Sequence, residues 1–185
     1  MTHLLNNNIN VEALFDEKIE EIAPSLSYFA DYDLIIGIPF SDEDDSLKPL
    51  LQSIDEVLQS WIGRRQLIVC VGSSSARETL ESIQELGLQH PHIEFLLPEE
   101  ISGRGMSIRA ILEIGDRMEA DLLLFSPNMA TEKGIGIDDS WLEGLLTPIQ
   151  GPYDLVLGSL RRYLGIDSIA HMMAAPFLET FYGSR

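Results

Sequence analysis

The sequence of 185 residues is poor in basic side chains and contains no long apolar run. Only 12 lysines and arginines stand against 30 aspartates and glutamates, so the net charge at neutral pH is −18. A chain this acidic lacks the basic surface that binding to nucleic acid or to an anionic membrane requires. We therefore expect any phosphate ligand to be held locally, by a few cations or by backbone amides.

Cysteine is almost absent as well. The single cysteine, Cys70, cannot form a disulfide within the chain, and it lies inside an apolar stretch. This setting predicts a buried thiol that packs as a small hydrophobic side chain rather than a nucleophile. No apolar run reaches the roughly 18 residues of a membrane span, and the acidic N-terminal region does not resemble a signal peptide. These absences favour a cytoplasmic protein without a membrane span.

The sequence does contain a regular alternation of apolar runs and amphipathic segments. Runs of strand length occur at residues 34–38, 67–71, 93–97, 121–125 and 154–158. Hydrophobic residues at helical spacing predict helices between them, and an N-terminal helix that Pro24 is expected to end. Continuously apolar strands separated by helices are typical of a parallel sheet covered on both faces. We predict an α/β fold, a doubly wound, mostly parallel sheet of about five strands, after a tail and helix in residues 1–30.

In such sheets ligands bind in the loops after the carboxyl ends of the strands. There is no P-loop sequence, and Gly103-Arg104-Gly105 lacks the third glycine of a dinucleotide fingerprint. These three residues still predict a local anion site, because the glycines allow close approach and Arg104 can bind phosphate at a helix N-terminus. Arg109 is expected to cluster near the same loop. A flexible loop that enters a helix is the alternative interpretation.

The other loops permit two interpretations each. After the first strand, Pro39 and Phe40 could form one wall of a pocket for a flat base, although the acidic residues that follow are also typical of a helix start. After the second strand, Gly72 and the serines at 73–75 could offer amides and hydroxyls to a phosphate, or form an ordinary turn. His90 and His92 indicate a solvated loop rather than a metal pair, because partners at ligand spacing are missing.

The order of these motifs resembles the nucleotide-binding half of family-2-like glycosyltransferases with the A-type fold. It is nearest to the branch that includes mannosylglycerate synthase and glucosyl-3-phosphoglycerate synthase. The similarity spans residues 31–185 and is carried by residues 33–40, 67–75, 103–111, 121–125, 141–149 and 153–162. In that family the fold binds a nucleotide-diphosphate sugar and transfers the sugar to an acceptor hydroxyl. The resemblance implies that Pro39 and Phe40 lie near the base, and Arg104 near the diphosphate or the donor sugar.

Three departures from the family pattern accompany this resemblance. Ser126-Pro127-Asn128 stands where the family has a D-x-D motif, so Mg²⁺ or Mn²⁺ would be held weakly, since one amide oxygen replaces two carboxylates. Gly72 stands near the place of an aspartate that recognises the base. The chain ends at Arg185, where the family continues into an acceptor-binding part. The expected molecule is a nucleotide-sugar-binding domain that lacks most of the acceptor-binding part and has no catalytic or metal-binding residue that we can assign.

Two functions follow from these observations. The first is a glycosyltransferase-like protein that binds a nucleotide-diphosphate sugar, with transfer to a small hydroxylated acceptor. The second is a non-catalytic, degenerate domain that acts as an interaction or regulatory subunit. Apolar residues at helical spacing between 166 and 182 predict a face that a second copy or another protein covers. We therefore expect a homo-oligomer or a complex.

Overall fold

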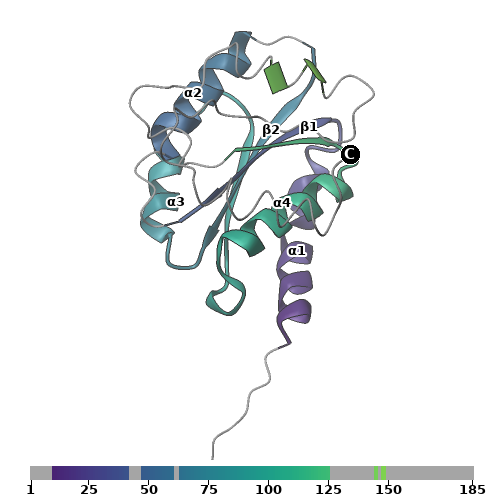
Figure 1. Cartoon of the computed structure of the whole chain (residues 1–185), viewed down its shortest axis with the longest axis vertical. Coiled ribbons are helices and arrows are strands. Elements are labelled where there is room, and N and C mark those ends of the chain that lie inside the picture. Colours follow the sequence, from purple (N-terminus) through teal and green to yellow (C-terminus); the bar gives the residue numbers. More distant parts are fainter. Residues whose placement is uncertain (1–9, 42–46, 61–62, 126–143, 146, 149–185) are drawn as a thin grey trace, which may run out of the picture. The chain divides into compact units, whose positions relative to one another are not determined.

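Figure 1 shows the computed structural model of the chain, which describes residues 10–41, 47–60, 63–125, 144–145 and 147–148. The chain divides into a unit Met1–Asp154 and a unit Leu155–Arg185, and every described residue belongs to the first. Its strands are β1 (Leu34–Phe40), β2 (Gln66–Ser73), β3 (His92–Leu97) and β4 (Asp121–Leu124). Its helices are α1 (Val11–Ser27), α2 (Leu47–Ser60), α3 (Arg77–Gln84), the 3-10 turn η1 (Glu99–Ile101) and α4 (Arg104–Arg117).

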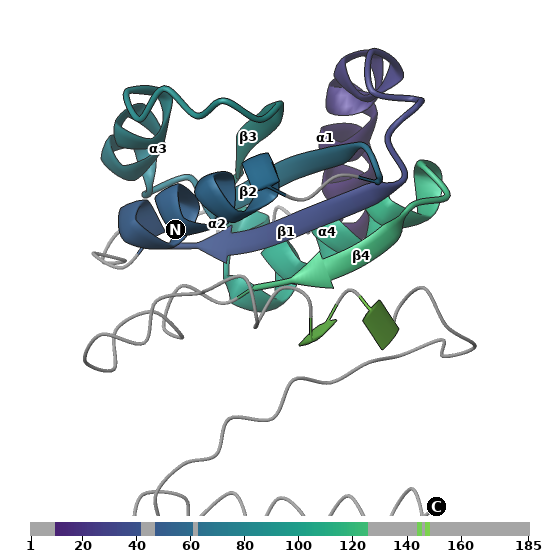
Figure 2. The same ribbon diagram turned by 90° about the horizontal axis from the view of Figure 1, so that it is seen from above.

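The four strands form one parallel sheet in the order β3-β2-β1-β4. Figure 2 shows β2 and β4 on opposite sides of β1. The register pairs Leu34 with Gln66 on one side and with Asp121 on the other. This confirms the α/β fold and its parallel sheet. The fifth strand that we predicted, at 154–158, lies outside the described residues, as does most of the helix predicted for 141–146, of which residues 144 and 145 are helical.

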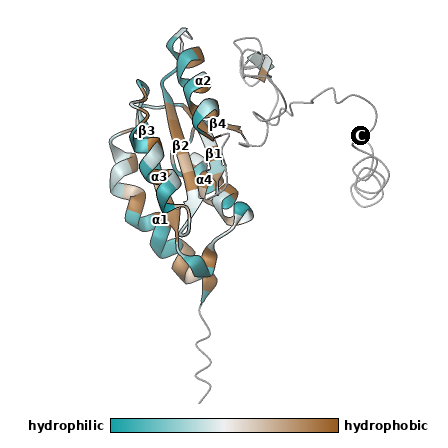
Figure 3. Ribbon diagram, turned by 90° about the vertical axis from the view of Figure 1, so that its left-hand side faces the viewer, coloured by the Kyte–Doolittle hydropathy of each residue, from teal (hydrophilic) through white to brown (hydrophobic). Residues whose placement is uncertain are grey.

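Alternate residues of the strands face two hydrophobic clusters, one on each side of the sheet. On one side Ile36 and Ile38 pack with Leu51 of α2 and Ile83 of α3. On the other side Ile35 and Val69, among others, pack with α1 and α4. In Figure 3, β2 is hydrophobic along most of its length, whereas the helices carry both hydrophilic and hydrophobic residues. Helices cover both faces of the sheet, as the continuously apolar strands predict.

The expected end of the N-terminal helix at Pro24 is wrong, because α1 continues to Ser27. Proline lacks an N–H, so Pro24 removes one helical hydrogen bond, but the residues after it can still donate theirs. Leu26 is buried in the cluster with α4, and the Ser27 hydroxyl donates to the carbonyl of Pro24 at 2.6 Å. Tertiary packing therefore holds the last turn. None of the helices in the described part of the chain is long and apolar enough to cross a membrane.

Candidate functional site

Most of the candidate residues that the structure describes lie at the carboxyl edge of the sheet. Because the strands are parallel, the ends of β1, β2 and β3 lie at one edge, and the helices that follow them begin there. Gly72 lies near the end of β2, and Gly103 directly precedes α4. Asn128, with Ser126 and Pro127, lies outside the described residues.

The start of α4 is an open helix N-terminus. Gly103 occupies the N-cap position with a φ of 116°, a conformation that favours glycine, and no side chain caps the helix. The first intrahelical hydrogen bond runs from the N–H of Ser107 to the carbonyl of Gly103 at 3.0 Å. The N–H groups of residues 104–106 have no partner within the helix. With no acidic residue in the first turn, this end of α4 can accept an anion.

Arg104, the first residue of α4, is exposed and forms no hydrogen bond or ion pair with any part of the chain that the structure describes. Most other described cations have an acidic partner: these are Lys18, Arg64, Arg65, Arg109 and Arg117. Lys48 and Arg77 resemble Arg104 in lacking an ion pair, and they lie in the first turns described for α2 and α3. The unpaired cations thus lie where helices begin at the carboxyl edge.

Arg77 differs from Arg104 in its surroundings. Glu78 follows it in the first turn of α3, and a shallow depression beside it is lined by Ser75, Glu78, Thr79 and Glu81. These carboxylates reduce the local positive potential. The first turn of α4, by contrast, contains no acidic residue beside Arg104.

Arg109 does not join Arg104, contrary to our expectation. Its guanidinium donates to both carboxylate oxygens of Glu12, at 2.9 and 2.5 Å, and lies 4.2 Å from the centre of the Phe15 ring. The hydrogen bonds with Glu12 raise the pKa of Arg109 and lower the pKa of Glu12. Arg109 therefore joins α4 to α1. The sequence could not indicate this, because Glu12 lies far away along the chain.

Pro39 and Phe40 belong to β1 itself, and both side chains are buried. The Phe40 ring packs in the cluster beneath α2 and extends over Gly72, where a Cβ would meet ring atoms at 2.5 Å and Leu96 at 3.0 Å. The absence of a side chain at position 72 thus has a structural reason, because Phe40 fills that space. In this structure neither Pro39 nor Phe40 presents an open face for stacking, and their proposed contact with a base stays a prediction.

The turn after β2 is rich in hydroxyl groups. Ser73 and Ser75 share a hydrogen bond of 2.8 Å between their Oγ atoms, and the N–H of Ala76 donates to the carbonyl of Ser73. Ser74 and Ser75 are exposed. This turn can offer hydroxyl donors to an oxygen-rich ligand at the same edge as the start of α4.

The histidines lie at the opposite, amino edge of the sheet. His90 contacts the buried Asp55 of α2, with 2.9 Å between Nδ1 and Oδ1, and the ring of His92 contacts the carbonyl of His90. Sequence reasoning missed Asp55. A charged residue on the apolar face of a helix, directly after Ile54, was the available signal. The described ranges hold no group of three metal-ligating side chains.

Cys70 is buried on β2, as predicted, and burial followed by the charge of Glu94 raises the pKa of its thiol. A thiol in this setting is not a nucleophile. No protein-family model matches the sequence, and a search of curated proteins found no significant relative.

Proposed function

We propose that this protein is glycosyltransferase-like and binds a nucleotide-diphosphate sugar at the carboxyl edge of its sheet. The observation that most supports this proposal is the start of α4, where Arg104, which has no partner among the described residues, lies in a first turn without acidic residues. The chain has a net charge of −18, yet within its described part Arg104 forms no ion pair with a carboxylate. A diphosphate would receive hydrogen bonds from the guanidinium and from the free N–H groups of that turn.

The proposed site also assigns a chemical role to these groups. Departure of a nucleoside diphosphate leaves negative charge on the leaving group, and fixed donors directed at that charge lower the barrier. Arg104 and the α4 amides would stabilise it, while the Ser73–Ser75 turn would offer donors to the nucleoside. Because Phe40 is buried against Gly72, we place the base against the backbone of this turn rather than against the ring.

The residues at the expected metal position favour weak rather than tight binding of a divalent cation. The described residues supply no cluster of three ligands, and Ser126-Pro127-Asn128 offers one amide in place of two carboxylates. We therefore derive no catalytic step through Mg²⁺ or Mn²⁺. The replacement at the D-x-D position supports the second candidate function, a non-catalytic domain that binds the donor and acts as an interaction or regulatory subunit.

Isothermal titration calorimetry tests the proposal. The full chain is titrated with UDP-, GDP- and ADP-sugars, with and without Mn²⁺, and at least one should bind. Arg104→Ala should weaken that binding by about tenfold or more, since it removes a charge-assisted contact. Arg65→Ala is the matched control, because Arg65 is exposed, pairs with Asp31 at 2.8 Å and precedes β2 at the amino edge.

The outcomes separate the alternatives. No heat with any nucleotide sugar refutes donor binding, and equal loss in both variants refutes the role of Arg104. Release of nucleoside diphosphate in the presence of small hydroxylated acceptors distinguishes an enzyme from a binding domain.

A further inference from the structure

The connection between α3 and β3, residues 85–91, is attached to α2 through one buried carboxylate. We call this connection the strap. Asp55, whose exposed fraction is only 6%, accepts hydrogen bonds from the backbone N–H of Gln89 at 3.1 Å and of His90 at 2.9 Å. It also contacts Nδ1 of His90 at 2.9 Å, and Gln59 on its own helix donates to it at 3.3 Å. One side chain thus holds two consecutive backbone amides of the strap.

The other contacts of the strap and α3 are few. The carbonyl of Pro91 accepts a hydrogen bond from the N–H of Ile68 on β2 at 3.1 Å, and Leu80 of α3 is partly buried against the cluster. Ile83 is the single buried residue of α3, and Leu86 and Leu88 of the strap are only partly buried against the cluster. The side chain of Gln84 donates to Glu94 of β3 at 3.0 Å, an exposed hydrogen bond. Segments with few buried contacts open locally at a lower free energy than global unfolding. Among the side chains, Asp55 makes the most hydrogen bonds to the strap.

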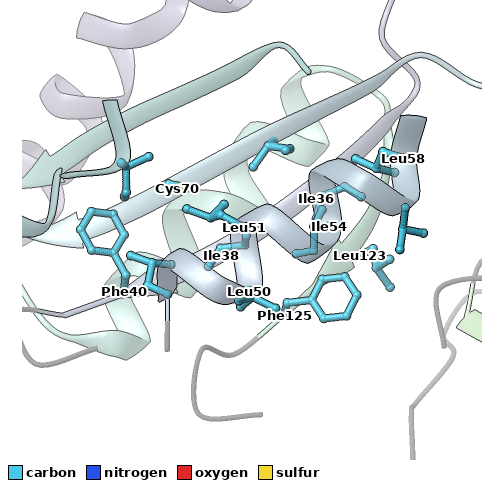
Figure 4. Packing of buried hydrophobic residues seen from close by; sticks show 14 of the residues in the cluster. Ile36, Ile38, Phe40, Leu50, Leu51, Ile54, Leu58, Cys70, Leu123 and Phe125 are labelled. Carbon is cyan, nitrogen blue, oxygen red and sulfur yellow. The ribbon is translucent and has the colours of Figure 1, made fainter. Parts of the chain in front are cut away.

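Cys70 lies on β2 and belongs to the cluster against which α2 and α3 pack. Cys70 is opposite Glu94 in the register of β2 and β3, and Glu94 is the residue that Gln84 of α3 contacts. Cys70 also belongs to the buried cluster that contains Ile83 and Leu51, and Figure 4 shows it beside Leu51 and Phe40. Displacement of α3 and the strap would remove Ile83, Leu86 and Leu88 from this cluster and so open its edge to solvent.

We propose that the strap is an acid-releasable element closed by the Asp55 carboxylate, and that its release frees α3 and uncovers Cys70. The proposal rests on the hydrogen bonds at Asp55 and is independent of any nucleotide-sugar site. It adds a conformational device to the amino edge of the sheet, on the face opposite α1 and α4.

The direction of the pH dependence follows from the groups around Asp55. Burial raises its pKa, but the hydrogen bonds from the backbone of His90 and Gln89 and from the His90 ring outweigh burial, and the pKa is lowered. A carboxyl group of this kind stabilises the fold above its unfolded pKa, and that stability is lost as the pH falls through the folded pKa. The strap is therefore closed at neutral pH and opens in acid.

The other charged groups near the strap do not change this direction. His90 is the titratable group that faces Asp55, and a protonated ring would strengthen the contact rather than weaken it. His92 and Glu94 of β3 face each other at 3.9 Å. No lysine or arginine of the described segments pairs with Asp55.

Because the chain has a single cysteine, thiol labelling reports on Cys70 alone. The full chain is treated with 4,4′-dithiodipyridine, which reacts with thiols in mild acid, and each labelling rate is divided by that of the urea-unfolded chain at the same pH. We expect Asp55→Asn to raise the relative rate at pH 7 by about 10- to 100-fold, from the loss of charged hydrogen bonds. Asp31→Asn, which neutralises an exposed carboxylate paired with Arg65, should leave it unchanged.

Two further measurements keep the proposal testable if Asp55→Asn does not fold. In the native protein the relative labelling rate should rise as the pH falls below about 4, before circular dichroism shows loss of helix. His90→Gln should raise the rate less than Asp55→Asn does, because the backbone hydrogen bonds stay. Labelling that rises only together with global unfolding overturns the proposal, as does a folded Asp55→Asn protein that labels like wild type.

Discussion

The close approach of α4 to β1 depends on the absence of a side chain at Gly37. A Cβ at this position would overlap the Cγ2 methyl of Ile111 on α4, and it would lie 3.3 Å from Cδ1 of Leu124. Ile111 is fully buried, so the methyl cannot swing into solvent. Overpacking of a buried site costs about 1–3 kcal/mol. We therefore expect Gly37→Ala to lower the free energy of unfolding by about that amount, and α4 to lie farther from the sheet.

A double-mutant cycle tests this argument by urea unfolding followed by circular dichroism. Ile111→Ala alone should cost about 2–5 kcal/mol, because it leaves a cavity. Gly37→Ala should then cost little or nothing in the Ile111→Ala background, since the added methyl enters that cavity. The coupling energy should be about 1–3 kcal/mol.

Gly115 provides the matched control on the same helix. A Cβ there would come no nearer than 3.8 Å to Leu122, which is ordinary contact. Because glycine is unfavourable inside a helix, Gly115→Ala should stabilise the protein by about 0.5–1 kcal/mol. Equal costs of Gly37→Ala with and without Ile111, or a destabilising Gly115→Ala, would refute the packing argument.

Two further predictions concern the contact between Gly72 of β2 and Phe40 of β1, and the attachment of α1 to α4. Gly72→Ala should destabilise the protein by about 1–3 kcal/mol, because its methyl would meet the Phe40 ring at 2.5 Å, and Phe40→Leu should reduce this cost in urea unfolding of the double variant. Arg109→Ala should increase amide hydrogen exchange along α1, since it removes two hydrogen bonds to Glu12 and the contact with Phe15. Exchange in α2 should not change, and unchanged exchange in α1 would contradict the role of Arg109.

β1 and β2 were predictable because each is a short, continuously apolar run that is buried along its length. β3 and β4 lie at the two ends of the described strand order and are only partly buried, but they too contain short runs of apolar residues. The sequence did not show that β1 extends through Pro39 and Phe40. β4 accompanies β1 only as far as Gly37, so Pro39 interrupts no ladder on that side, whereas β2 pairs with β1 up to Gly72. Proline is tolerated in a strand under this condition. The order of the strands in the sheet depends on the tertiary structure and could not be predicted from the apolar runs.

The candidate site, too, was predictable from the sequence only in part. Local signals predicted that a helix begins near Gly103-Arg104, because glycine and a following amphipathic pattern are local features. The partners of the arginines were not predictable, since Arg109 pairs with Glu12 and Arg64 with Asp121 across large separations in sequence. Those pairings depend on which helices and strand ends the fold brings together.

The excess of acidic residues determines which cations of the fold have a carboxylate partner. Where acidic residues outnumber basic ones this strongly, a cation placed at random on the surface finds a carboxylate nearby. Arg64 does so with Asp33 and Asp121 before β2, Arg65 with Asp31, and Arg117 with Glu20 and Glu113 at the end of α4. Arg104 forms no such pair within the described part of the chain, although its side chain is long enough to reach across a helical turn. Arg77 also lacks an ion pair among the described residues although Glu78 follows it, and the first turn of α4 differs in that it contains no acidic residue. This absence is what a site for an anionic ligand needs, because an internal carboxylate would compete with the ligand for the same guanidinium.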